Sequence, residues 1–119
     1  DLVIARAKER QENAERLSVA RLRAVDTMRG SLNGDVNRLR GQIHYREQLH
    51  KQYVAKPRQV KINLSKLTSS TGRSLDQVIS AIPTASSITE LNLLKAELTE
   101  IRRKVDEDVR TIKRLGNFT

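Results

Sequence analysis

The side chains best suited to chemistry in this sequence are two histidines and one run of acidic residues. His44 and His50 are six residues apart, about 120° around a helix, so they do not form an i,i+4 metal pair. The run 106–108 has the carboxylates for a divalent ion, but it lies between Arg102 and Arg110, so helical ion pairing explains it better. The sequence has no Cys, Gly-rich phosphate loop, Ser/His/Asp order or zinc-ligand spacing. We therefore expect no enzyme activity, no metal and no cofactor.

The distribution of charge is the most informative feature of the chain. Residues 36–73 contain nine basic residues and one acidic residue, and so carry +8 of the net charge of +9. With two tyrosines as stacking groups, they form a candidate surface for an anionic partner. The residues of this candidate surface are Arg38, Arg40, Arg46, Lys51, Lys56, Arg58, Lys61, Lys66, Arg73, Tyr45 and Tyr53. The alternatives are that the charge serves solubility alone, binds nucleic acid, or faces an acidic protein or anionic membrane headgroups.

The composition indicates a thin helical rod rather than a compact sphere. Apolar residues make up 37% and charged residues 31% of the 119 positions, and only three residues are aromatic. No apolar run approaches the roughly 18 residues that a transmembrane helix needs. The chain begins without an initiator Met, and we expect it to be a single-domain fragment of a longer protein. It shows no signal peptide, which a fragment could have lost, and a cytoplasmic location is slightly favoured.

A long first helix is predicted over about 2–55, where Pro is absent and good helix formers dominate. Its apolar residues follow heptad steps and predict a coiled-coil seam, with Arg29 at one missed position. The seam residues are Leu22, Val25, Leu32, Val36, Leu39 and Ile43. A small-xxx-small step, Gly30 to Gly34, lies inside this stretch, and a hairpin broken there is the alternative. We favour one continuous helix because the apolar phase runs through the glycines.

Pro57 ends the first helix, and the alternating residues 59–64 predict a short strand or extended arm. Residues 65–73 contain little apolar material, so we expect them to be the least ordered part of the chain. Ser74 and Gln77 match a capping box and predict a small helix at 75–82, which gives a connecting arm and helix over about 59–82.

A second long helix is predicted over about 88–115, with Ser87 and Glu90 as its capping box. Its heptad seam is broken only where Asp108 falls, and a local phase shift onto Val109 would restore it. The seam residues are Leu91, Leu94, Leu98, Ile101, Val105 and Ile112. At 1.5 Å per residue the two long helices span about 80 Å and about 43 Å. In an antiparallel pair, over a third of the first helix therefore has no partner within the chain. We expect it to pack against another chain or against missing residues.

These patterns together predict an all-α, elongated antiparallel helical hairpin or coiled coil. The function they indicate is a non-enzymatic structural or protein-interaction module that oligomerises or scaffolds through its seams. The expected partner is a protein or a second copy of the chain. The alternatives are a basic helical nucleic-acid-binding domain that uses residues 36–73, and a helical arm of a secreted toxin, phage or secretion-apparatus protein.

Overall fold

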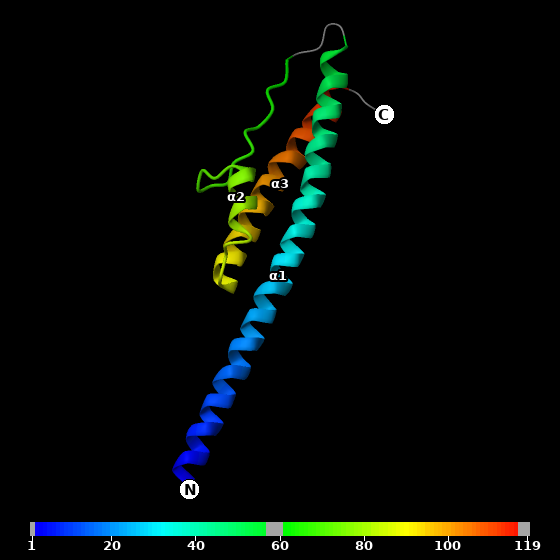
Figure 1. Cartoon of the computed structure of the whole chain (residues 1–119). Coiled ribbons are helices and arrows are strands. Elements are labelled where there is room, and N and C mark those ends of the chain that lie inside the picture. Colours follow the sequence, from blue (N-terminus) through cyan, green and yellow to red (C-terminus); the bar gives the residue numbers. More distant parts are fainter. Residues whose placement is uncertain (1, 57–60, 117–119) are drawn as a thin grey trace.

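The computed structural model describes residues 2–56 and 61–116, which form an elongated helical hairpin (Figure 1). Within these ranges the chain forms α1 (Leu2–Val54), α2 (Leu75–Ala81) and α3 (Ile88–Gly116), each ending within one residue of the predicted position. The long helices α1 and α3 pack antiparallel, and the short α2 packs on α3. The predicted all-α hairpin is confirmed.

α1 is one continuous helix of 53 residues, so the alternative hairpin at Gly30–Gly34 does not occur. The two glycines also make no close helix contact, because a Cβ added at either would meet nothing within 4 Å. Their cost in a helix interior, about 1 kcal/mol each relative to Ala, is offset by the packed seam that runs through the same stretch.

The hydrophobic core lies between α3 and the second half of α1, as the two predicted seams require. The six predicted seam residues of α3 are buried, and on α1 Val25, Leu32, Val36 and Leu39 are buried beside a half-buried Ile43. Leu22 is different, because its side chain is 65% exposed. The intramolecular seam therefore begins at Val25.

The seam of α3 does not shift phase at its acidic position. Asp108 itself is buried in the interface and Val109 is only half buried. Val109 packs against both core clusters beside Asp108, but the predicted phase shift does not occur, because Asp108 keeps its own position in the interface. Asp108 can stay in phase because Arg46 of α1 and Ser65 of the connecting segment supply hydrogen bonds to its carboxylate.

Residues 61–67 of the connecting segment between α1 and α2 form neither helix nor strand. Farther along the segment, one isolated antiparallel bridge joins Thr68 to Ser74. Residues 59 and 60 of the predicted arm lie outside the described residues. α2 begins with the predicted capping box of Ser74 and Gln77. At the start of α3 the Ser87 hydroxyl accepts from the Glu90 backbone N–H, but the Glu90 carboxylate accepts from Ser86 instead of Ser87.

The molecule is a rod of 87 × 26 × 18 Å with a radius of gyration of 22.2 Å. A compact chain of the same length would have a radius of gyration of about 13.5 Å. The difference arises because α3 has only 29 residues against the 53 of α1. The first half of α1 consequently extends beyond the hairpin (Figure 1).

Leu98 offers a direct test of the core. Its side chain is 4% exposed and packs in the cluster shared by α1 and α3, so Leu98→Ala should lower the free energy of unfolding by roughly 2–5 kcal/mol in a urea titration. Leu93→Ala on the same helix is the control, because Leu93 is half exposed, and it should cost less than about 1 kcal/mol. Equal losses in the two variants would contradict the assigned seam.

Candidate interaction surfaces

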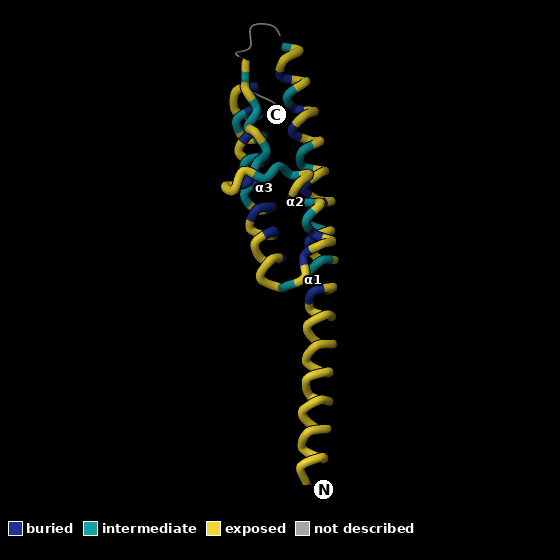
Figure 2. The backbone as a smooth tube through the Cα atoms, turned by 60° about the vertical axis from the view of Figure 1, so that its left-hand side comes forward, coloured by how far each residue is buried: buried dark blue, intermediate teal, exposed yellow. Residues whose placement is uncertain are grey.

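The first half of α1 is exposed along its whole length. Every residue from 2 to 24 is exposed, and Figure 2 shows this part of the helix uncovered from the N-terminus to the start of the hairpin. We call residues 2–24 the α1 extension. Its large exposed side chains include Leu17 and Leu22, at 59% and 65% exposure. The extension contributes no residue to either core cluster.

The sequence explains why the intramolecular seam stops at Val25. The buried residues of α1 recur in steps of seven at Val25, Leu32 and Leu39. The same steps taken backwards from Val25 reach Ser18 and Gln11, which are polar. Leu22 and Ile4 are the large apolar residues on this side of the extension, and Ser18 and Gln11 lie between them, so the side that continues the hairpin seam has no continuous apolar row for a matching partner.

An adjacent stripe on the extension has the spacing of a coiled-coil seam. Its positions follow alternating steps of three and four residues, so they line one side of the helix. We call it the extension stripe, and it consists of Ala7, Arg10, Ala14, Leu17, Arg21 and Ala24. The next step leads to Met28, which packs against the hairpin core. The extension stripe thus runs along the exposed part of α1 up to the first turn of the hairpin.

A buried polar junction ties α1, the connecting segment and α3 together. The Asp108 carboxylate accepts hydrogen bonds from the Arg46 guanidinium at 3.1 Å, the Ser65 backbone N–H at 2.9 Å and the Ser65 hydroxyl at 2.7 Å. The side chains of Arg46 and Asp108 are only 8% and 12% exposed. A buried ion pair stabilises a fold only when further hydrogen bonds satisfy the ions. Ser65 supplies them to the Asp108 carboxylate, whereas the buried Arg46 Nε has no hydrogen-bond partner among the described residues.

The polar residues that follow Ser65 are also held against α3. Glu100 accepts from the backbone N–H and the hydroxyl of Ser70, at 2.6 Å and 3.0 Å. Buried Glu97 accepts from the Thr71 hydroxyl at 3.2 Å and lies 3.5 Å from the Arg73 guanidinium. Sequence reasoning missed these anchors, because they are hydrogen bonds to residues of α3 that are far away in the sequence. They act together with Leu67, which packs against the core.

Four members of the candidate anionic-partner surface have roles inside the protein. Arg46 is bound to Asp108, and Tyr53 is 1% exposed in a cluster with Leu49 and Ile112. Lys56 donates to the Gly116 carbonyl at the end of α3, and Arg73 pairs with Glu97. Arg46 and Tyr53 are thereby removed from the candidate surface, since neither can reach a partner without unpacking the hairpin. Arg46 and Tyr53 follow Leu39 at successive intervals of seven residues, and this heptad spacing is the sequence feature that places them on the core face of α1.

The other candidate cations stay on the outside. The exposed members are Arg38, Arg40, Lys51, Lys61 and Lys66. The Tyr45 ring is partly exposed, and the Lys113 ammonium lies 5.3 Å from its centroid. Arg58 lies outside the described residues.

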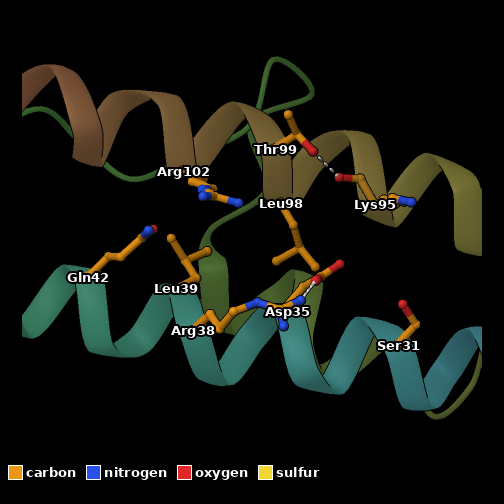
Figure 3. Close-up of a pocket in the computed structure, with 9 residues that line it drawn as sticks. All are labelled: Ser31, Asp35, Arg38, Leu39, Gln42, Lys95, Leu98, Thr99 and Arg102. Atoms are coloured by element: carbon orange, nitrogen blue, oxygen red, sulfur yellow. Dashed lines mark hydrogen bonds and ion pairs between the residues drawn. The ribbon is translucent and has the colours of Figure 1, made fainter.

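A groove runs between α1 and α3 at the level of Leu39 and Leu98 (Figure 3), with a cavity of about 230 Å³. Its basic residues include Arg38 and Arg102, but each has an acidic neighbour on its own helix. Arg38 pairs with Asp35, and the Arg102 guanidinium lies 4.0 Å from Asp106. The groove therefore offers no converging set of unpaired charges.

The histidines and acidic residues singled out in the sequence do not gather into a metal site. The His50 ring nitrogen lies 3.0 Å from the Ile62 carbonyl, and the His44 ring lies 3.3 Å from the Gln48 amide. Among residues 2–56 and 61–116, no group of three His, Cys, Asp or Glu side chains is placed to hold a metal ion. No helix in these ranges is long and apolar enough to cross a membrane.

Comparisons of this chain with protein-family models, with characterised proteins and with solved structures found no match.

Asp108→Ala tests the buried junction. The variant leaves the Arg46 guanidinium buried without its carboxylate, so the free energy of unfolding should fall by roughly 3–5 kcal/mol. Asp106→Ala is the matched control, because that side chain is 42% exposed, and it should change stability by less than about 0.5 kcal/mol. The double variant Arg46→Met/Asp108→Leu should recover part of the loss, because it removes the unpaired guanidinium but leaves the Ser65 N–H without its acceptor. Similar losses for the two single variants would show that the junction does not stabilise the hairpin.

Proposed function

We propose that this chain is a non-enzymatic structural module that binds a further protein helix, from another protein or from a second copy of itself, along the α1 extension. The observation that carries this proposal is the uniform exposure of residues 2–24 on a helix that continues into a packed hairpin. In such an arrangement the hairpin anchors the helix, and the helix face with coiled-coil spacing remains available to a partner helix.

The energetics of isolated helices support the same conclusion. A helix without tertiary packing is marginal in water even with favourable residues, because most helical stability in proteins comes from burial of one face. The α1 extension has no such burial within the described chain, yet it carries apolar side chains in heptad spacing. A second helix on the extension stripe would bury Leu17 and the neighbouring alanines and supply the missing packing.

The hairpin holds the C-terminal end of the α1 extension in one position and direction. Val25 and Leu32 lock the adjoining turns of α1 against the core, and helix hydrogen bonding continues through to the extension without a break. A partner held there would therefore be held at a defined direction from the hairpin, which is the property of a scaffold or spacer.

Nucleic-acid binding is a second candidate function, supported by the cations that stay exposed at the hairpin. Within residues 36–56, Arg38, Arg40 and Lys51 are exposed, and Glu47 is the only acidic residue. These are the charges that phosphate contacts require. The enclosure of Arg46 and Tyr53 in the core weakens this candidate relative to helix binding.

Leu17→Glu in the full chain tests the proposed function. The probe is a synthetic amphipathic helix of the same length as the extension, with Leu at every seam position, and binding is followed by fluorescence anisotropy. Leu17→Glu should weaken binding by about tenfold or more, because it removes the one large apolar side chain of the extension stripe, which would otherwise be buried against the Leu seam of the probe. Neither residue 17 nor residue 19 belongs to the core, so unfolding in urea should be unchanged.

Val19→Glu is the control for this experiment, because Val19 is two residues from Leu17 and so projects from nearly the opposite side of the helix. It should bind the probe as the unmodified chain does. The proposed function fails if the unmodified chain binds no helical probe and also remains monomeric by light scattering across the accessible concentration range.

The nucleic-acid candidate predicts a steep fall in affinity for duplex DNA as salt increases. Replacing Arg38, Arg40 and Lys51 with Gln should flatten the slope of log affinity against log salt by about 0.9 for each phosphate that is no longer neutralised. Stability should not change, because all three side chains are exposed. Absence of binding to duplex and single-stranded oligonucleotides at low salt would exclude this function.

A further inference from the structure

We infer that the partner of the α1 extension is an acidic amphipathic helix with carboxylates opposite Arg10 and Arg21, rather than a second copy of this chain. The inference rests on the proposed function, because it specifies the chemistry of the helix that binds there. It follows from where these two arginines lie on the extension stripe and from what surrounds them.

Arg10 and Arg21 lie at seam positions. Ala7 and Ala14 flank Arg10 along the extension stripe, and Leu17 and Ala24 flank Arg21 in the same way. A helix packed on this stripe would cover the apolar neighbours and meet both guanidinium groups. A charged residue at a seam position lowers the stability of a coiled coil in general and at the same time selects the partner that can satisfy it.

The extension itself cannot neutralise the two arginines. None of the residues three or four positions from Arg10 or Arg21 is acidic. The three acidic residues of the extension, Glu9, Glu12 and Glu15, project mainly from the other side of the helix. Within the described part of the chain neither arginine forms a salt bridge, whereas Arg29 at the first turn of the hairpin pairs with Asp26.

Pairing with a second copy sets arginine against arginine. In a parallel, in-register pair, Arg10 faces Arg10 and Arg21 faces Arg21 of the other copy. In the antiparallel pair that overlaps the whole extension stripe, Ala7 faces Ala24, Ala14 faces Leu17, and Arg10 faces Arg21. Both arrangements place like charges in one layer of the seam, which opposes association.

Slipping the antiparallel pair by one heptad separates the arginines but does not satisfy them. Arg21 of one copy then lies against Leu17 of the other, and Arg10 lies against Met28. Each guanidinium is placed beside an apolar layer with no carboxylate within reach. The extension also carries six basic and three acidic residues, so the overall charge of two copies adds to the repulsion.

An acidic helix removes both problems. Arg10 and Arg21 are eleven residues apart, about 16 Å along the helix, so a partner helix with two carboxylates at the same separation could pair with both. Arginine suits this role because its planar guanidinium binds a carboxylate in a bidentate manner. The remaining apolar positions of the stripe would pack against ordinary Leu or Ala positions of the partner.

The test compares three synthetic helices as long as the α1 extension, with Leu seams that differ at the two positions opposite the arginines. These positions hold Glu in the first, Leu in the second and Lys in the third. The full chain should bind the Glu helix about tenfold or more tightly than the Leu helix, and the Lys helix weakest. Anisotropy titrations of the labelled helices give the affinities.

Matched variants of the full chain distinguish seam pairing from general attraction. Arg10→Leu/Arg21→Leu should abolish the preference for Glu and make the chain self-associate in sedimentation equilibrium, because its seam is then apolar. Arg16→Leu/Arg23→Leu removes the same charge from the opposite side of the helix, and it should keep the preference for Glu and should not self-associate through the extension stripe.

Three results would overturn the inference. Tighter binding of the Leu helix than of the Glu helix would leave the proposed helix-binding function standing but refute the acidic partner. Self-association of the unmodified chain that weakens in Arg10→Leu/Arg21→Leu would show that the arginines serve a homo-oligomer. An equal loss of the Glu preference in both double variants would show that bulk charge, not the seam, selects the partner. Failure of all three helices to bind a chain that also remains monomeric would instead refute the proposed function itself.

Discussion

The packing of α3 against the second half of α1 is the contact on which the rest of the molecule depends. It buries two clusters of mainly Leu, Ile and Val side chains, between Val25 and Tyr53 on α1 and between Leu91 and Ile112 on α3, and it sets the direction of both helices. Because α3 is little more than half as long as α1, the same contact determines where α1 leaves the hairpin. The α1 extension is therefore exposed because α3 is too short to cover the whole of α1.

Polar interactions give this apolar contact its register. Leucine-rich seams tolerate slippage, whereas a buried carboxylate must meet its donors at one position. Asp108 meets Arg46 across the interface and Ser65 beside it, so sliding either helix by one turn would leave a charge buried and unpaired. The same carboxylate holds the connecting segment, which has few apolar residues of its own. Glu97 and Glu100 continue this anchoring along α3.

The basic residues serve different purposes in different parts of the rod. At the hairpin, Arg46, Lys56 and Arg73 bind acceptors within the chain and help to close it. On the α1 extension, Arg10 and Arg21 have no acidic residue three or four positions away and lie among apolar residues with coiled-coil spacing. The net charge of the chain thus combines cations that anchor the hairpin with exposed cations on the extension, which the proposed acidic helix would neutralise.

The sequence by itself determined the helices and the faces that pack, because these depend on local periodicity. Heptad spacing identified Leu98 and its neighbours as core, the capping box at Ser74 located α2, and the continuous apolar phase carried α1 through Gly30 and Gly34. Tertiary structure decided what the charged residues do, since a charge on a helix face is equally compatible with solvent and with a buried partner. Only the approach of α1, the connecting segment and α3 enclosed Tyr53 and brought Arg46 to Asp108, because that ion pair joins residues 62 positions apart in the chain.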